Sequence, residues 1–208
     1  MYPATQDRNL VTGPTTKLAA FTTMALLAVL VSCQGCPPAG SGITVPSSDS
    51  TPPGLTLGFG LEGSSTPSVT VSAGGPTQTM TLAQKTGKLS LLATASDQES
   101  GILSLGIFME ADTVRCPAHQ PCTGNPNHGL WSTPNFVLNN PAVNPGSSGA
   151  LPSSILAESV DLSTLITAAP TNAGDSVTTT IWLMATSQNQ LNGTSNTAEG
   201  KVVFTETK

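Results

Sequence analysis

Residues 177–186 read VTTTIWLMAT, a run whose apolar positions merge into a nearly continuous stretch. A strand that is covered on both faces shows this pattern, whereas a strand with one solvated face alternates between apolar and polar residues. We therefore expect 177–186 to be a central strand. Trp182 is the aromatic residue that we expect in the core.

Seven further segments on either side of this run alternate apolar with polar residues and are bounded by Gly, Pro, Asn or Ser, as strands are. Only residues 163–169, after Asp161, suggest a helical turn. Because each sheet must bury one face, seven or eight short strands predict an all-β fold, an antiparallel β-sandwich of two stacked sheets. The segments are 55–61, 68–73, 77–83, 88–95, 102–110, 155–162 and 201–205.

The composition agrees with this fold class and excludes one class of partner. Only 9% of the 208 residues are charged, and 20 Gly and 17 Pro interrupt the chain, which argues against a charge-rich helical protein. The net charge is −5 and no basic run exists. A nucleic-acid backbone needs such a basic surface, so we expect no nucleic-acid partner.

The N-terminus has the features of an export signal. Arg8 and Lys17 precede the apolar stretch 18–31, which is shorter than the roughly 20 residues of a membrane-spanning helix. The next residues, Leu-Val-Ser-Cys at 30–33, resemble the lipobox of bacterial lipoproteins. There are two alternatives to a lipoprotein signal: an ordinary secretory signal, and an apolar first helix of a cytoplasmic protein.

The lipobox resemblance implies a signal peptide over 1–32 and a diacylglycerol and palmitate anchor on Cys33. The chain would then lie in the cell envelope, bound to the membrane through its lipid. Gln34 is not the aspartate that is linked to inner-membrane retention, so the outer membrane is expected in a Gram-negative cell. Residues 33–54, rich in Pro, Gly and Ser, are expected to be a flexible tether to a single domain over 55–208.

Two cysteines of this domain lie close together in the sequence. In an oxidising compartment, Cys116 and Cys122 are expected to form a local disulfide. Cys36 is left over as a free thiol, an intermolecular link, or the lipid site in place of Cys33 if cleavage occurs three residues later. Alternatively, Cys116, His119, Cys122 and His128 supply the four ligands that zinc needs, and the chain is a metal-handling envelope protein.

Two longer segments resemble bacterial immunoglobulin-like or cadherin-like domains. Residues 91–102, LLATASDQESGI, are similar to the second strand, loop and third strand of these domains, and residues 181–195, IWLMATSQNQLNGTS, to the sixth strand and the loop after it. The resemblance implies an immunoglobulin-like sandwich. This chain has Ser187 where many such domains have aspartate, and a long insertion at about 112–154.

In such a sandwich, the loops at 97–101 and 188–194 lie at the same end. Their oxygen-bearing side chains are candidates for a calcium site, since calcium takes six to eight oxygen ligands. The alternative is that they only form turns. The candidates are Asp97, Glu99, Asn189 and Asn192.

Catalytic patterns are weak in this sequence. The two histidines both lie in the cysteine loop, and no Gly-x-Ser-x-Gly motif occurs. Residues 58–63, GFGLEG, match a dinucleotide-binding fingerprint but open no helix, so we interpret them as a glycine-rich strand. We expect no enzymatic activity. A hydrolase would need two close carboxylates in a concave site.

The insertion is the main candidate for binding, because long loops on a rigid sandwich commonly carry function. Trp131 and Phe136 are expected either to contact a protein or glycan, or to pack down and cap the core. The function expected from the sequence is a lipid-anchored binding or scaffolding module of the cell envelope.

Overall fold

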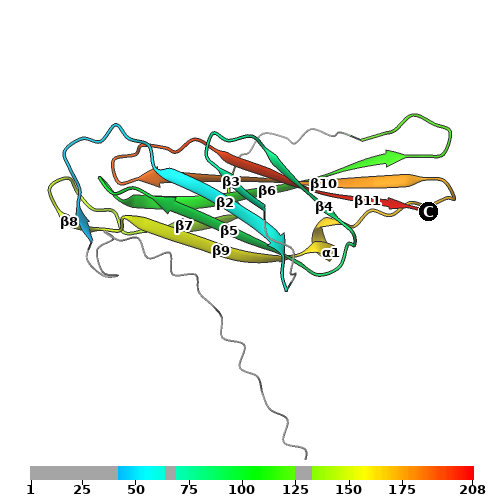
Figure 1. Cartoon of the computed structure of the whole chain (residues 1–208), viewed down its shortest axis with the longest axis horizontal. Helices are drawn as coiled ribbons and strands as arrows, with labels where there is room; N and C mark the ends of the chain where they lie inside the picture. Colours follow the sequence, from blue (N-terminus) through cyan, green and yellow to red (C-terminus); the bar gives the residue numbers. More distant parts are fainter. Residues whose placement is uncertain (1–41, 64–68, 125–132) are drawn as a thin grey trace, which may run out of the picture. The chain divides into compact units, whose positions relative to one another are not determined.

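The computed structural model describes residues 42–63, 69–124 and 133–208, which belong to a compact unit over 37–208. This unit is built almost entirely from strands (Figure 1). In the described ranges, no helix has both the length and the apolar character needed to cross a membrane.

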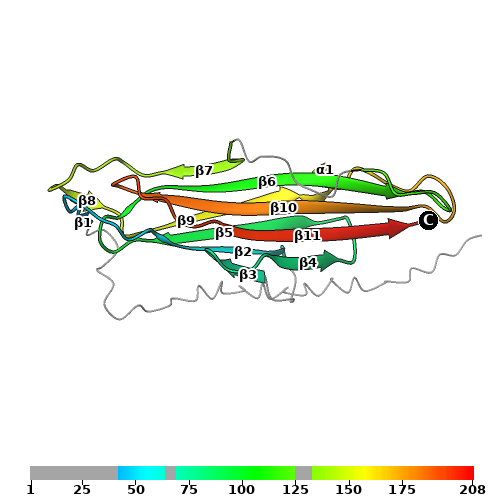
Figure 2. The ribbon, with the colours of Figure 1, turned by 90° about the horizontal axis from the view of Figure 1, so that it is seen from above.

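Two sheets form the body of the unit (Figures 1 and 2). All strand pairs are antiparallel except β4 with β11, which run parallel. A small third sheet pairs β1 (Ile43–Thr44) with β8 (Ser148–Ala150). The five-stranded sheet has the order β4 (Gln78–Leu82), β11 (Ala198–Thr207), β10 (Ser176–Asn189), β6 (Ile102–Cys116) and β7 (Phe136–Asn139), and the four-stranded sheet the order β3 (Val69–Ser72), β2 (Gly54–Leu61), β5 (Lys88–Ser96) and β9 (Ser153–Asp161).

The expected all-β sandwich is confirmed. Strands β2, β5 and β9 take the places of strands A, B and E of an immunoglobulin-like sandwich, and β6, β10 and β11 those of C, F and G. The run at 177–186 is central, because β10 pairs with both β6 and β11. The insertion is less irregular than expected, since it contributes the end of β6 and the strands β7 and β8.

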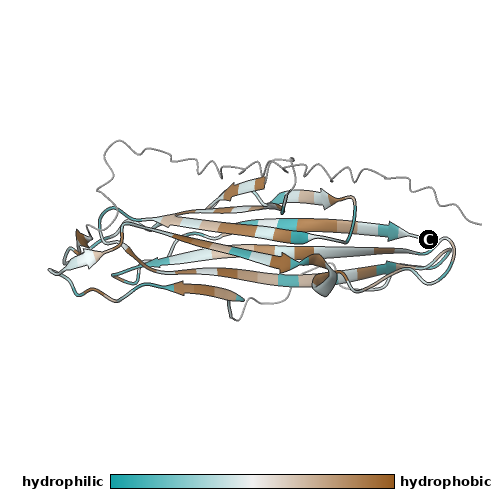
Figure 3. Ribbon diagram, turned by 90° about the horizontal axis from the view of Figure 1, so that it is seen from below, coloured by the Kyte–Doolittle hydropathy of each residue, from teal (hydrophilic) through white to brown (hydrophobic). Residues whose placement is uncertain are grey.

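The core lies between the two large sheets and is filled by alternate residues of each strand. In β5, Leu89, Leu91 and Ala93 are fully buried, as is Ile181 in β10. The alternation appears in Figure 3 as apolar and polar bands that change along each strand. Phe59, with 1% of its surface exposed, is the aromatic residue at the centre.

The expectation for Trp182 is wrong, because the parity of β10 turns it outward. The inward residues of this strand carry odd numbers, such as Ile181 and Leu183. Trp182 is half-buried on the outer face, where its Nε1 donates to Asp112 Oδ2 at 3.1 Å. Lys201 Nζ lies 5.3 Å from the centre of its ring.

The ordered domain begins earlier than residue 55, so the tether expected over 33–54 is too long at its C-terminal end. Ile43 pairs with Ala150, and Val45 is fully buried. Asp49 accepts a hydrogen bond from Ser100 Oγ at 2.6 Å. Burial of Val45 and the bonds of Asp49 hold this polar segment on the sandwich.

Two local expectations are confirmed. The helical turn is α1 (Leu162–Leu165), and Asp161 caps it by accepting from the backbone N–H of Ser163 at 3.0 Å. The segment 58–61 lies inside β2, as expected for a glycine-rich strand, and Gly63 with φ 73° forms the following turn.

Candidate functional site

The expected disulfide between Cys116 and Cys122 is confirmed, with an S–S distance of 2.06 Å. Backbone hydrogen bonds in both directions between Arg115 and Thr123 close the loop beside it. The backbone N–H of Ala118 donates to Asp175 Oδ1 at 3.0 Å, which fixes the tip of the loop to the turn before β10.

Asp175 has an unusually acidic carboxyl group. Backbone N–H groups of Ala118 and Asn172 donate to it, and these bonds lower its pKa from 3.8 to about 2. The carboxylate is therefore charged over the whole physiological range. Its position between two loops indicates a structural role.

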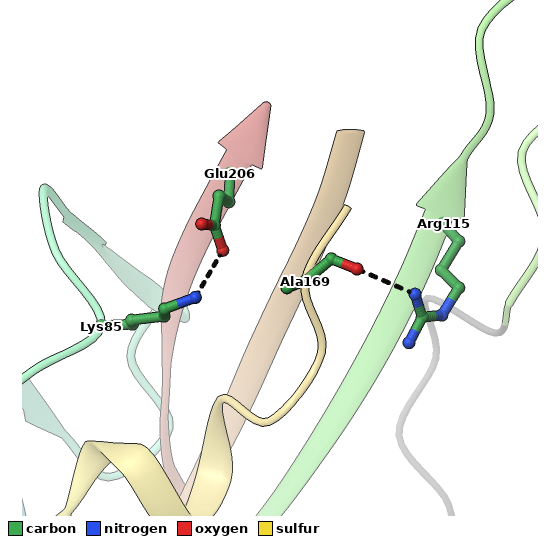
Figure 4. A network of polar contacts seen from close by, with 4 residues as sticks. All are labelled: Lys85, Arg115, Ala169 and Glu206. Carbon is green, nitrogen blue, oxygen red and sulfur yellow. Dashed lines mark hydrogen bonds and ion pairs between the residues drawn. The ribbon is translucent and has the colours of Figure 1, made fainter. Parts of the chain in front are cut away.

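Side-chain contacts tie further segments together at this end of the sandwich (Figure 4). Arg115 Nη1 donates to the carbonyl of Ala169 at 3.2 Å, and Lys85 forms an ion pair with Glu206 at 2.8 Å. The two side chains of the ion pair are 39% and 33% exposed, so water screens the pair and its contribution to stability is small.

The zinc alternative loses two ligands in this structure. Cys116 and Cys122 are bonded to each other and offer no thiolate. His119 is exposed and has a φ of 62°. His128 lies outside the described residues.

The aromatic residues of the insertion can be followed only in part. Phe136 begins β7 and packs against the core, which supports the capping interpretation for this residue. Trp131, Cys33 and Cys36 lie outside the described residues.

The loops at 97–101 and 188–194 meet at one end of the sandwich, as expected. Asn189 Nδ2 donates to Asp97 Oδ2 at 3.1 Å, and both side chains are buried. However, Asn189 Oδ1 accepts the backbone N–H groups of Leu191 and Gly193. The amide therefore presents its nitrogen, not its oxygen, to the carboxylate, and a nitrogen donor is the wrong partner for a cation.

The other calcium candidates do not complete an oxygen cage. Asn192 Oδ1 accepts from Gln188 Nε2 at 3.3 Å on the exposed side of the loop. A side-chain hydrogen bond with Asp49 and the negative charge of Asp49 both raise the pKa of Glu99. Among the described residues, no group of three His, Cys, Asp or Glu side chains is placed to hold a metal ion.

The hydrogen bonds at this end hold the segment before β2. Asp49 accepts from Ser100 Oγ at 2.6 Å and from Asn189 Nδ2 at 3.3 Å. The loop after β5 and the end of β10 are thus both bonded to this one side chain. The Ser100 hydroxyl is the main cause that lowers the pKa of Asp49. The polar side chains at this end of the sandwich thus form hydrogen bonds with one another, which indicates a structural role.

A different surface has the shape of a binding site. Two adjoining hollows of about 360 and 610 Å³ lie on the outer face of the four-stranded sheet and share Thr56 and Thr94. We call them together the outer-face groove. Its outward-facing residues come from all four strands, and most of them are small or carry a hydroxyl group. They are Thr56, Gly58, Thr70, Ser72, Ser90, Leu92, Thr94, Ser96, Ser153 and Ile155.

Glycine creates the depth of this groove. Gly58 lies in β2 opposite Leu92, and a Cβ atom built on it would lie 3.6 Å from the Leu92 carbonyl oxygen, an ordinary contact. A side chain is therefore permitted at Gly58, and its absence leaves open space. Leu92 and Ile155 border the groove with 44% and 65% of their surfaces exposed.

The groove is almost free of charge. Glu62, at one end, is the only ionisable residue among the described residues that line the two hollows. The hydroxyl groups of Thr56 and Thr94 lie 2.6 Å apart and bond to each other across the floor. The groove is thus a neutral surface whose hydroxyl groups both donate and accept hydrogen bonds.

Reasoning from the sequence missed this surface. Its residues are unremarkable Gly, Ser and Thr in four separate segments, and only the strand register places them on one face. The available signal was the outward half of the alternation in 54–60 and 88–96, where nearly every residue is Gly, Ser or Thr. Comparisons with family models, with curated proteins and with solved structures found no match to this chain.

Proposed function

We propose that the chain is a lipid-anchored, non-catalytic module of the cell envelope and that it binds a neutral glycan strand in the outer-face groove. The signal-like apolar stretch 18–31 and the resemblance of residues 30–33 to a lipobox support the location. The observation that carries the binding role is the groove itself, a long hollow lined with hydroxyl groups on a rigid sheet.

The lining favours a glycan over a protein partner. Sugar hydroxyls donate and accept hydrogen bonds, as Thr56, Ser90 and Thr94 do, and the exposed Leu92 can contact the C–H face of a sugar ring. Protein interfaces are centred on buried aromatic or arginine anchors. Among the described residues of this groove, no aromatic or arginine side chain faces outward.

The same lining supports binding without hydrolysis. Glycoside hydrolysis needs two carboxyl groups about 5 to 9.5 Å apart across the scissile bond. The groove has a single carboxylate, Glu62, at its end. Asp49, Asp97 and Glu99 approach one another at the end of the sandwich, where their hydrogen bonds hold loops.

A variant that fills the groove tests the proposal. Gly58→Leu places a side chain on the floor where the backbone permits one. Ala111→Leu adds the same bulk at an exposed position of β6 in the other sheet, away from the groove, and is the matched control. Binding of the purified chain is measured by co-sedimentation with peptidoglycan sacculi and by titration with a soluble neutral envelope polysaccharide.

We expect Gly58→Leu to weaken binding by about tenfold or more and Ala111→Leu to leave it unchanged. Added salt should change the affinity little, because the groove is neutral. Unchanged binding by Gly58→Leu, or binding that salt abolishes, would overturn the proposal.

A further inference from the structure

Strand β9 forms an open edge of the four-stranded sheet. Within the described part of the chain, it pairs only with β5 (Figure 1). The pairing continues without a bulge from Ser153 to Asp161. The other edge of β9 therefore has backbone groups available for a further strand.

The phase of the β5–β9 ladder shows which groups these are. Backbone N–H groups donate from Asp97 to Pro152 and from Leu162 to Gly87, at 2.9 and 3.0 Å. Bonded and non-bonded pairs alternate in an antiparallel ladder, so the even-numbered residues of β9 bond to β5. The odd-numbered residues, Ser153 to Asp161, direct their N–H and C=O groups to the open edge.

This edge lacks several of the features that usually prevent strand addition, although its C-terminal half carries two acidic residues. The sequence of β9, SSILAESVD, contains no proline and no lysine. Ile155 is 65% exposed, the largest value among the exposed large hydrophobic residues of the described part. Its neighbour Leu92, on β5, is 44% exposed. A strand added at this edge would cover apolar surface as well as backbone groups.

The charges of β9 favour a second copy of the same strand. Both acidic residues, Glu158 and Asp161, lie in its C-terminal half, and the half from Ser153 to Ala157 is uncharged. In an antiparallel pair centred on Ala157, Asp161 lies opposite Ser153 of the second copy. Glu158 lies opposite Leu156 of the second copy, so no like charges face each other.

We propose that two copies of this chain associate by antiparallel pairing of their β9 strands, centred on Ala157. This register pairs every odd-numbered residue of one edge with an odd-numbered residue of the other. The two four-stranded sheets become one continuous sheet of eight strands. Because the two-fold axis is perpendicular to the sheet, both outer-face grooves lie on the same side. The pairing does not depend on what the groove binds.

Site-specific cross-linking tests the register. In a bonded antiparallel pair, the two Cα atoms lie about 5.5 Å apart, a distance that a disulfide spans. The chain is isolated in mild detergent as its cells produce it, with Cys36→Ser to remove a competing thiol. We expect Ala157→Cys to give a covalent dimer on mild oxidation, with the link mapped to position 157 of both copies by peptide mass spectrometry. Val203→Cys, on the outer face of β11, should give no covalent dimer.

Sedimentation velocity tests the interface without a cross-link. Ile155→Lys places a charge at the edge, and Ala157→Pro removes an N–H that does not bond to β5, so both variants should fold. We expect each to weaken the dimer by about tenfold or more, whereas Val203→Lys leaves it unchanged. Circular dichroism confirms the fold. A chain that is monomeric at every concentration, or a dimer that both edge variants leave intact, would overturn the proposal.

Discussion

The contact between Phe59 and Gly200 holds the two sheets at their observed spacing and predicts a coupled pair of substitutions. Phe59 lies on β2, is 1% exposed and points across the core to Gly200 on β11. A Cβ atom on Gly200 would overlap Cε1 and Cζ of the Phe59 ring. The ring is almost fully buried, so it cannot move away into solvent.

Gly200→Ala should therefore destabilise the fold by about 1 to 3 kcal/mol, the usual cost of overpacking a core. Phe59→Leu removes the two overlapping ring atoms and should itself cost about 1 to 2 kcal/mol, less than the loss of a whole aromatic side chain. In the Phe59→Leu background, Gly200→Ala should cost little. The expected coupling is about 1 to 2 kcal/mol in favour of the double variant.

Urea unfolding followed by tryptophan fluorescence gives the four free energies of this cycle. The double variant should be about as stable as Phe59→Leu alone. If Gly200→Ala is neutral in the original chain, or if the two losses simply add, then Phe59 does not fill the space in front of Gly200 and the described packing of the sheets is wrong.

Three further predictions concern single sites. Ser187 Oγ is a buried atom without a hydrogen-bond partner in the described part of the chain, so Ser187→Ala should raise the free energy of unfolding by up to about 1 kcal/mol; a loss measured by urea titration would show a missing partner. Replacing Cys116 and Cys122 by serine should lower the free energy of unfolding by about 2 kcal/mol, a small loss for a disulfide because the loop that it closes is short. The replacement should also make this loop more sensitive to proteolysis, and an unchanged digestion pattern would contradict the anchoring role of the disulfide. The folded pKa of Asp175 lies below its unfolded value, so its stabilisation is present above pH 3.8 and is lost as the pH falls toward about 2; Asp175→Ala should remove this part of the acid-unfolding curve, and an unchanged curve would refute the assignment.

Local patterns in the sequence predicted the strands but not their faces. Alternation and turn residues identified eight strands near their observed positions, because both features act within a few neighbouring residues. The direction of Trp182 depends on which parity of β10 faces the core, and a nearly continuous apolar run does not reveal the parity. The strand β1 was missed because two residues in a Pro- and Ser-rich segment show no alternation.

The candidate sites depended on register and on side-chain orientation. The topology correctly placed Asp97 beside Asn189, but only the structure shows that the Asn189 oxygen turns to its own loop. The outer-face groove unites residues from four segments through the register of three strand pairs. The outward residues of 54–60 and 88–96 are mostly Gly, Ser or Thr, but the sequence alone does not show that these segments share a face.

The accessibility of the groove in the native envelope shows whether the groove is occupied there, as we propose. Leu92→Cys places a thiol on the border of the groove, and Ala111→Cys places one at an exposed position of β6 in the other sheet. The two thiols are labelled with a maleimide in intact envelopes and in purified protein, and the labelled peptides are quantified by mass spectrometry. We predict that the thiol of Leu92→Cys is protected in the envelope and reactive after purification, whereas that of Ala111→Cys reacts in both. Equal labelling of both thiols in the envelope would contradict it.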